Sequence, residues 1–293
     1  MFAQIFSITA PVFLCAGIGM AWAKKGIPYE TAFVTRLVTI VGVPCLIFST
    51  LVKANITPDE LATMGFASLA SVVIFAAIAV PALRFFKLKQ RTYLPAILFA
   101  NTGNMALPLC LFAFGEQGLA LGIAYFAVSA LLLFVLGPAI AAGASNPKGT
   151  LKMPLVWALL AALLTKCSGV TIFPWFFKTI ELLGNMAIPL MLITLGVSVS
   201  RLEIISLNRS IGLSVFRLTM GFIVGFGLAV MLGYEGAARG VLIIQCSMPV
   251  AVFNYLFAQA HGNDPEEVAG TVLVSTGLSF LTLPALLWFV MSI

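Results

Sequence analysis

Apolar residues occupy this chain in long blocks that short polar or charged segments separate. Ten blocks extend over residues 4–23, 31–52, 61–83, 92–115, 119–143, 153–171, 175–199, 208–233, 237–260 and 266–292. Each is close to the roughly 20 residues that cross a hydrocarbon core as a helix. The short alternating segments that are typical of membrane β-barrels are absent from the sequence. The pattern therefore predicts an all-α polytopic membrane protein with ten transmembrane helices.

Prolines recur at corresponding places in the two halves of the chain. Their separations are 143, 145, 141 and 146 positions for the pairs Pro11 and Pro154, Pro44 and Pro189, Pro108 and Pro249, Pro138 and Pro284. Such a period indicates an internal repeat. Because each half has five spans, an odd number, the second half enters the membrane from the opposite side. We predict two inverted five-helix repeats, over residues 1–143 and 153–293, joined by a linker at 144–152.

Composition and charge agree with a membrane location. Hydrophobic residues make up 61% of the chain and charged residues only 9%, against about a quarter charged in soluble domains. The mean hydropathy is +1.11. The net charge of +6 comes without basic runs, so we expect the lipid bilayer as a partner and no nucleic acid. Loops after odd-numbered spans hold ten basic residues and the opposite loops four, which predicts cytoplasmic odd loops and both termini outside.

Two spans carry polar residues and proline in their apolar middles. The span at 92–115 contains Asn101, Thr102, Asn104 and Pro108, and the span at 237–260 contains Gln245, Ser247, Pro249 and Asn254. Proline removes a backbone hydrogen bond, and neighbouring amides and hydroxyls can satisfy the groups that it frees. We therefore predict that spans 4 and 9 are broken helices that cross near the membrane midplane.

The crossing is the candidate binding site. Broken helices present N-terminal N–H groups that attract anions, although C-terminal ends also meet there. Apart from Glu181, which lies close to a span, the acidic residues lie in loops or at span ends, which favours a small anion, a carboxylate. The predicted substrate-binding residues are Asn101, Thr102, Asn104, Pro108, Gln245, Ser247, Pro249 and Asn254. An alternative is that Asn101, Asn104 and Gln245 only satisfy broken backbone or join spans.

Other sequence features have mainly structural interpretations. The five cysteines show no metal-ligand or disulfide spacing, so we expect no metal site and no cofactor. Arg217 lies well inside a span, eight residues after Arg209. We expect it to snorkel to the cytoplasmic interface rather than to contact substrate. The GxxxG pattern at Gly221 and Gly225 predicts close helix packing.

The whole chain resembles the auxin efflux carrier family, in its branch of small bacterial permeases. The resemblance rests on the segment 101–109, on Met248-Pro249 with Asn254, and on the closing pattern from Asp264-Pro265 to Leu283-Pro284. It implies a scaffold domain of spans 1, 2, 6 and 7 and a transport domain of spans 3–5 and 8–10, with crossing helices at Pro108 and Pro249. It also implies elevator-type transport of organic anions such as malate, malonate or auxin, a homodimer, and a place in the bacterial inner membrane.

These features predict a secondary transporter or facilitator of a small carboxylate, not an enzyme. The chain has no Walker motif for ATP and no span that pairs a nucleophile with a base. Two alternatives stay open. A sodium-coupled carrier of the bile-acid-symporter type would show sodium-dependent uptake, and a membrane-embedded ligand sensor would bind its ligand without flux.

Overall fold

The computed structural model describes residues 2–143, 153–168 and 170–292, and the regular elements within these ranges are all helical. The helices are α1 (Phe2–Lys24), α2 (Thr31–Leu37), α3 (Val43–Lys53), α4 (Pro58–Phe85), α5 (Gln90–Leu98), α6 (Leu107–Ala142), α7 (Pro154–Ser168), α8 (Pro174–Asn185), α9 (Ala187–Ser200), α10 (Leu207–Met231), α11 (Gly236–Cys246), α12 (Phe253–His261) and α13 (Pro265–Ser292). Two π-helical turns, η1 (Val38–Gly42) and η2 (Thr102–Ala106), join α2 to α3 and precede α6. The all-helical class is confirmed, and the predicted linker at 144–152 lies outside the described residues.

Seven segments of the described chain are long and apolar enough to cross a membrane. They are Ala3–Lys24, Thr31–Lys53, Pro58–Phe85, Thr102–Ala142, Pro174–Ser200, Leu207–Met231 and Pro265–Ser292. Seven is fewer than the ten spans expected, because some apolar blocks are interrupted. Thr102–Ala142 has 41 residues, about 60 Å if straight and twice a hydrocarbon core. It is divided at Gly115, whose φ of 62° and ψ of −154° are not helical.

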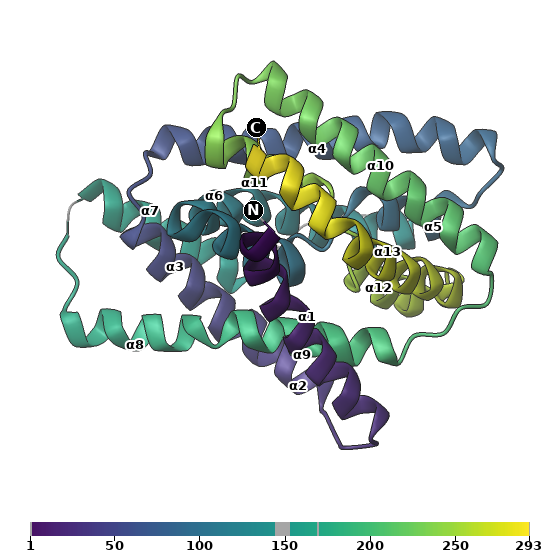
Figure 1. Ribbon diagram of the computed structural model, residues 1–293, viewed down its shortest axis with the longest axis horizontal. Coiled ribbons are helices and arrows are strands. Elements are labelled where there is room, and N and C mark those ends of the chain that lie inside the picture. The colour runs from purple at the N-terminus through teal and green to yellow at the C-terminus, as the bar shows by residue number, and fades with distance from the viewer. Residues whose placement is uncertain (1, 144–152, 169, 293) are drawn as a thin grey trace.

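The helices pack in two groups (Figure 1). In one group α1 packs along α9, and α3 packs on α7 and α8. In the other, α4 packs on α5 and α6, while α10 packs on α4, α11 and α13. Figure 1 shows α4 and α10 along one edge of the molecule and α8 with α9 along the opposite edge. The turn η2 lies where the groups meet, since it packs on α6 of one group and on α9 of the other.

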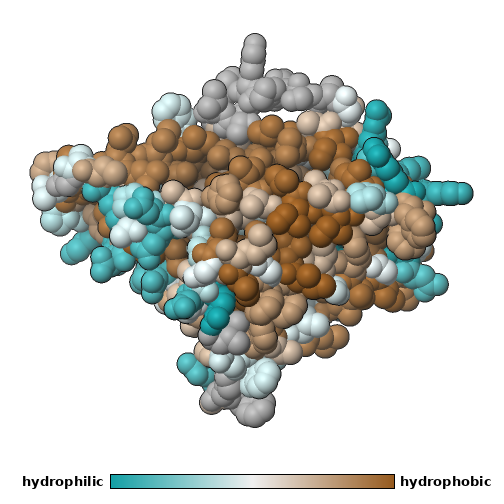
Figure 2. Space-filling view, turned by 90° about the horizontal axis from the view of Figure 1, so that it is seen from above, coloured by the Kyte–Doolittle hydropathy of each residue, from teal (hydrophilic) through white to brown (hydrophobic). Residues whose placement is uncertain are grey.

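The outer surface has the polarity of a lipid-facing protein. Large apolar side chains such as Phe66, Ile223 and Leu281 are exposed along α4, α10 and α13. Figure 2 shows a broad hydrophobic face, with hydrophilic residues gathered toward the two ends of the long axis. Exposed apolar surface on this scale is costly in water and favourable in a bilayer. The chain is therefore a multi-pass membrane protein, as predicted.

Helix α1 and helix α9 approach until their backbones touch. A Cβ atom added at Gly19 would stand 2.0 Å from the carbonyl oxygen of Ile193, and one added at Gly196 would stand 1.9 Å from that of Ala16. Only glycine permits this approach, in the way that small residues permit close helix packing in membranes. The contact fixes the position of α9, which lines the candidate site described below.

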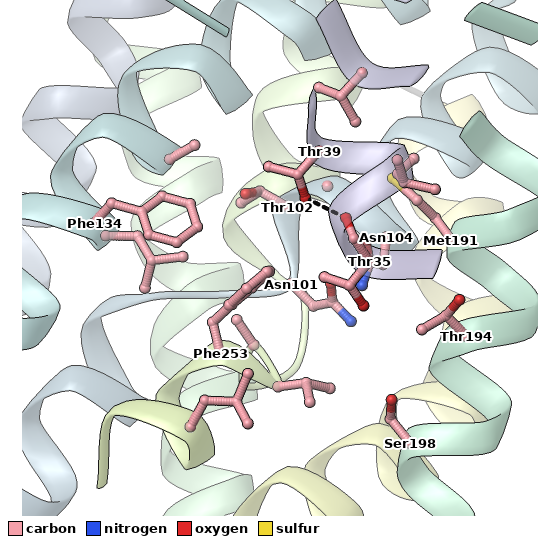
Figure 3. A pocket seen from close by; sticks show the side chains of 18 of the residues that line it. Thr35, Thr39, Asn101, Thr102, Asn104, Phe134, Met191, Thr194, Ser198 and Phe253 are labelled. Atoms are coloured by element: carbon pink, nitrogen blue, oxygen red, sulfur yellow. Dashed lines mark hydrogen bonds between the residues drawn. The ribbon is translucent and has the colours of Figure 1, made fainter. Parts of the chain in front are cut away.

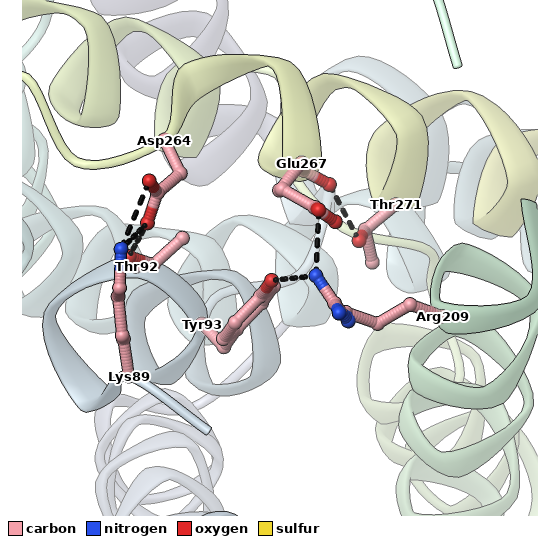
Figure 4. Close-up of polar contacts among 7 residues, drawn as sticks. All are labelled: Lys89, Thr92, Tyr93, Arg209, Asp264, Glu267 and Thr271. Carbon is pink, nitrogen blue, oxygen red and sulfur yellow. Dashed lines mark hydrogen bonds and ion pairs between the residues drawn. The ribbon is translucent and has the colours of Figure 1, made fainter. Parts of the chain in front are cut away.

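Ion pairs join the ends of α5, α10 and α13 (Figure 4). The Lys89 ammonium donates to both carboxylate oxygens of Asp264, at 3.1 and 2.9 Å, and Thr92 Oγ1 donates to the same carboxylate at 3.0 Å. Arg209 donates to Glu267 at 2.6 Å. The ammonium of Lys89 holds the pKa of the Asp264 carboxyl below its usual 3.8, and the carboxylate raises the pKa of Lys89 above 10.5. Both groups are therefore charged near neutral pH.

We expect Asp264→Asn to lower the melting temperature slightly, by about 1 to 2 °C, because the partner Lys89 is exposed to solvent. Asparagine tolerates the φ of 46° at this position as well as aspartate does. A lowered carboxyl pKa stabilises the fold above the unfolded pKa, and this contribution is lost as the pH falls through the folded pKa. Thermal unfolding in detergent should show a constant difference between the two proteins from pH 5 to 9, which begins to shrink below about pH 4 and disappears below the folded pKa. A difference that persists at low pH would contradict the ion-pair explanation.

Candidate functional site

Two helices are interrupted within the predicted segments. Helix α5 ends at Leu98, and Phe99 and Ala100 are extended before η2 begins at Thr102. Helix α11 ends at Cys246, and helix α12 begins at Phe253. Pro249 lies inside the second interruption, as expected. Pro108, however, lies in the first turn of α6, seven residues beyond the break, so the expected break at Pro108 is misplaced. Because η2 runs directly into α6, Pro108 lies inside a continuous helical segment, and the wider π turn before it accommodates the N–H that proline lacks.

The two interruptions cross and pair through their backbones. Ala100 and Val250 form an antiparallel bridge. The Asn101 N–H donates to the Pro249 carbonyl at 2.8 Å, and the Ala251 N–H donates to the Phe99 carbonyl at 3.1 Å. Each broken segment therefore satisfies groups that the other leaves free, which a chain buried away from water requires.

A cavity of about 380 Å³ lies against this crossing. Its wall includes Asn101, Thr102 and Asn104 from the first break, and Ala251 to Phe253 from the second. Residues of α2, η1, α3, α6, α7 and α9 supply the rest of the wall. Arg201 is the one charged residue among the described residues of the lining. Figure 3 shows Asn101 and Asn104 pointing into the space, with Thr194 and Ser198 on one side and Phe134 and Phe253 toward the other.

Of the helix ends at the two interruptions, the cavity meets the N-termini, and the C-terminal end of α9 lines it from the side. The N-terminal turn of η2, from Thr102 to Asn104, and the start of α12 at Phe253 both belong to its lining. Leu98 and Cys246, the last residues of α5 and α11, are not part of the described lining. N-terminal ends carry free N–H groups and a partial positive charge of about half an elementary charge. At the crossing itself, the helix ends that face the cavity are therefore the positive ones.

Asn101, Thr102 and Asn104 are the predicted binding residues that the structure brings to the cavity. Asn101 is only 4% exposed, and its Nδ2 has no hydrogen-bond partner among the described residues. A buried amide donor without a partner carries a free-energy cost unless a ligand or water accepts its proton. Asn101 is thus the strongest single indication of a ligand at the crossing.

The predicted residues of the second break are buried behind the cavity instead. Gln245 Nε2 donates to the Gly122 carbonyl at 3.1 Å, and Asn254 Nδ2 donates to the carbonyls of Phe99 at 3.0 Å and Ala251 at 3.1 Å. Ser247 is 6% exposed. These side chains and Pro249 are absent from the described lining. Gln245 thus makes a contact of the kind that the structural alternative describes, and Asn254, which that alternative did not include, does the same.

Two rows of hydroxyl groups, none of them among the predicted binding residues, line the cavity. Thr31, Thr35 and Thr39 follow each other at intervals of four residues, and Thr194 and Ser198 do the same on α9. Residues four apart share one face of a helix, so this spacing was a signal available in the sequence. The rows add hydrogen-bonding capacity along the side of the cavity.

Arg201, at the end of α9, closes the second row. Its Nη1 donates to Thr31 Oγ1 and its Nη2 to the Tyr29 carbonyl, both at 3.1 Å. Tyr29 in turn makes a 2.7 Å hydrogen bond with Thr194 through the two hydroxyl groups. This exposed cation is tethered by neutral groups, so its charge is available to an anion that enters the cavity.

The expectation that Arg217 snorkels to the interface is wrong. Its exposure is 0%, and its Nη1 donates to the Cys246 carbonyl at 3.1 Å. The end of α11 offers a hydrogen-bond acceptor to the guanidinium, and Gly221 leaves room for it. The close packing predicted for Gly221 and Gly225 is confirmed, since Cβ atoms there would stand 2.2 Å from the Cys246 carbonyl oxygen and 2.8 Å from its Cβ.

Fold and cavity together define a polytopic helical membrane protein with a solute-sized space at two crossing helix breaks. The family model described as "Membrane transport protein" matches residues 143–287. An uncharacterized transporter of Methanocaldococcus jannaschii is 26% identical over 281 residues, which cover 88% of this chain and 89% of that protein. An uncharacterized transporter of Methanothermobacter thermautotrophicus is 25% identical over 277 residues, 89% of each chain. The chain is therefore similar to this family of membrane transport proteins, in agreement with its resemblance to the auxin efflux carrier family, and it is a membrane transporter.

Proposed function

We propose that this transporter carries small carboxylate anions by alternating access, as a secondary transporter or facilitator. The observation that carries the proposal is that the cavity at the crossing meets two helix N-termini, the amides of Asn101 and Asn104, and the cation Arg201. Helix N-termini and amide donors stabilise negative charge. None of the described lining residues is acidic, so a cation would find no carboxylate partner in this space.

The size and remaining lining of the cavity fit a small organic acid. A volume of about 380 Å³ is near the lower end of the range for small-molecule sites, about 300 to 1,000 Å³. The carboxylate would accept from Asn101 and Asn104, while Phe134, Phe253 and Met191 contact the carbon skeleton. Malate, malonate and an auxin-like acid are candidates of suitable class.

An elevator movement is the mechanism that we infer. The packing of α1–α3 with α7–α9, and of α4–α6 with α10–α13, supports a scaffold domain and a transport domain. Taken with the breaks at Gly115, between α5 and α6, and between α11 and α12, this packing also supports ten spans in two inverted repeats.

A second cavity of about 280 Å³ lies between α3, α6 and α8, where Lys53 pairs with Glu181. This second cavity lies between the same two groups as the first, which supports a movement of one group along the other. A homodimer in the bacterial inner membrane, with both termini outside, stays a prediction.

Arg201 and Thr31 neighbour loops that the positive-inside rule assigns to the cytoplasm. In this topology the larger cavity faces inward. An inside-negative membrane potential then favours outward movement of an uncoupled anion, by about 2.3 kcal/mol per charge per 100 mV.

Sodium coupling is the second candidate. Three buried oxygen atoms near the second break, Gln245 Oε1, Ser247 Oγ and Asn254 Oδ1, have no partner among the described residues. Neutral oxygen ligands of this kind suit a hard cation such as sodium, and half-helix ends provide such sites in other transporter folds. A sodium ion there would couple to the substrate rather than replace it.

The test is charge movement by the purified protein in liposomes on a solid-supported membrane. We expect malate, malonate or an aromatic monocarboxylate to evoke currents without a sodium gradient. Arg201→Gln should weaken the apparent affinity about tenfold through loss of one charge-assisted contact, whereas Arg201→Lys should keep most of it. Currents that require sodium would favour the second candidate. Flux of cationic substrates alone would overturn the anion proposal, and carboxylate binding without flux would identify a sensor.

A further inference from the structure

Arg217 is a buried cation that lacks an acidic partner. Its guanidinium carbon stands 4.7 Å from the centroid of the Phe75 ring, and Nη1 donates to the Cys246 carbonyl. Its Nε and Nη2 have no hydrogen-bond partner among the described residues, and the ion pairs of the described chain do not include it. A charge is rarely buried in a membrane protein without a functional reason.

The acceptor of Arg217 is a helix end. Cys246 is the last residue of α11, and the final carbonyls of a helix lack intrahelical partners and carry a partial negative charge. Gly221 makes the contact possible, because a Cβ atom there would stand 2.7 Å from Arg217 Nη1. Arg217 therefore caps the C-terminus that faces the crossing and offsets its negative end.

The charge of Arg217 exceeds what that helix end offsets. A helix C-terminus carries about half a negative elementary charge, and a guanidinium carries a full positive one. The polar neighbours of Cys246 are neutral: Tyr125 makes hydrogen bonds with Ser71 at 2.6 Å and with Cys246 Sγ at 3.4 Å. A net positive charge thus remains behind the crossing.

This charge lies close enough to act on a ligand in the cavity. Pro249 follows Cys246 by three residues and accepts from the Asn101 N–H at 2.8 Å, and three residues span at most about 10 Å. With the 3.1 Å hydrogen bond from Arg217 to Cys246 and the 2.8 Å one from Asn101 to Pro249, the path from the guanidinium to Asn101 is at most about 16 Å. At that distance and an effective dielectric constant of about 20, a unit charge changes the affinity of a monoanion about fivefold.

We propose that Arg217 is a positioning residue that sets the charge selectivity of the crossing by neutralising the end of α11 and adding positive potential behind Asn101. The inference rests on the proposed function, since it assumes that the ligand is an anion. It predicts a dependence on ligand charge, which a residue with only a structural role does not produce.

The experiment measures the binding of malonate, its monoamide and its diamide to the full-length protein in nanodiscs at pH 7.5. These ligands have similar size and carry two, one and no negative charges. We expect Arg217→Gln to weaken malonate about thirtyfold and the monoamide about fivefold, and to leave the diamide unchanged. Arg217→Lys, which retains the charge, should stay within about threefold of the wild type for all three.

A second pair of variants tests the charge without removing Arg217. Phe75→Glu places a carboxylate against the guanidinium, so it should reproduce the charge-graded loss, while Phe75→Gln should not. Equal weakening of all three ligands, or no change in either charge-cancelling variant, would overturn the inference and leave the carboxylate proposal intact. Wild-type protein that binds none of the three would instead overturn the carboxylate proposal, and this inference with it.

Discussion

Replacing Asn104 by aspartate is expected to abolish carboxylate binding and transport. The substitution keeps the shape of the side chain and adds a negative charge to the cavity lining. Two like charges about 4 Å apart repel by about 4 kcal/mol at an effective dielectric constant of about 20, which corresponds to roughly a thousandfold loss of affinity. Asn104→Ala removes a hydrogen bond to a charged group, so it should cost only about 10- to 100-fold.

The measurement is the dissociation constant for the carboxylate that gives the largest current, together with that current. Asn185→Asp is a matched control, because Asn185 is exposed in the lining of the other cavity and should leave binding at the crossing unchanged. If Asn104→Asp binds the carboxylate as the wild type does, the anion does not lie at Asn104. If the variant gains uptake of sodium or of a cation, the site has the opposite sign to the one proposed.

The second large effect is expected from adding one methyl group to α1. Gly19→Ala would bring Cβ to 2.0 Å from the Ile193 carbonyl oxygen, a distance that only a shift of α1 or α9 can relieve. Overpacking of this kind typically costs 1 to 3 kcal/mol. Because the obstacle is backbone, we expect about 3 kcal/mol or more. At about 2 to 4 °C per kcal/mol, the melting temperature should fall by roughly 10 °C.

Gly17→Ala, two residues away on the same helix, is the control. A Cβ atom at Gly17 meets nothing within 4 Å, and alanine is the better helix former by about 0.8 to 1.0 kcal/mol. Thermal unfolding in detergent should therefore show Gly17→Ala at or slightly above the wild type. Equal stability of the Gly19 and Gly17 variants would mean that α1 and α9 do not pack as described.

The location of the breaks was predictable, whereas the roles of individual side chains in them were only partly so. Polar residues and proline in apolar blocks identify both interruptions. Proline frees backbone groups from the helix, and in lipid these groups need polar partners, which an unbroken helix does not require. The same residue types either bind ligand or satisfy backbone. Asn101 and Asn254 are both buried amides, yet Asn101 lines the cavity and Asn254 donates to Phe99. Their chemistry is identical, so only their surroundings distinguish them.

Sequence alone determined the helical membrane class, the interrupted segments and the residues Asn101, Thr102 and Asn104 of the cavity. These follow from local rules, since a span length, a proline and an amide act within a few residues of themselves. Tertiary structure decided which helix ends face the cavity, that Arg217 caps Cys246 rather than reaching the interface, and that Thr35, Thr194 and Arg201 join the wall. Those outcomes depend on contacts between segments far apart in the chain, such as α9 against η2 and α10 against α11. No local pattern of hydrophobic and polar positions encodes such contacts.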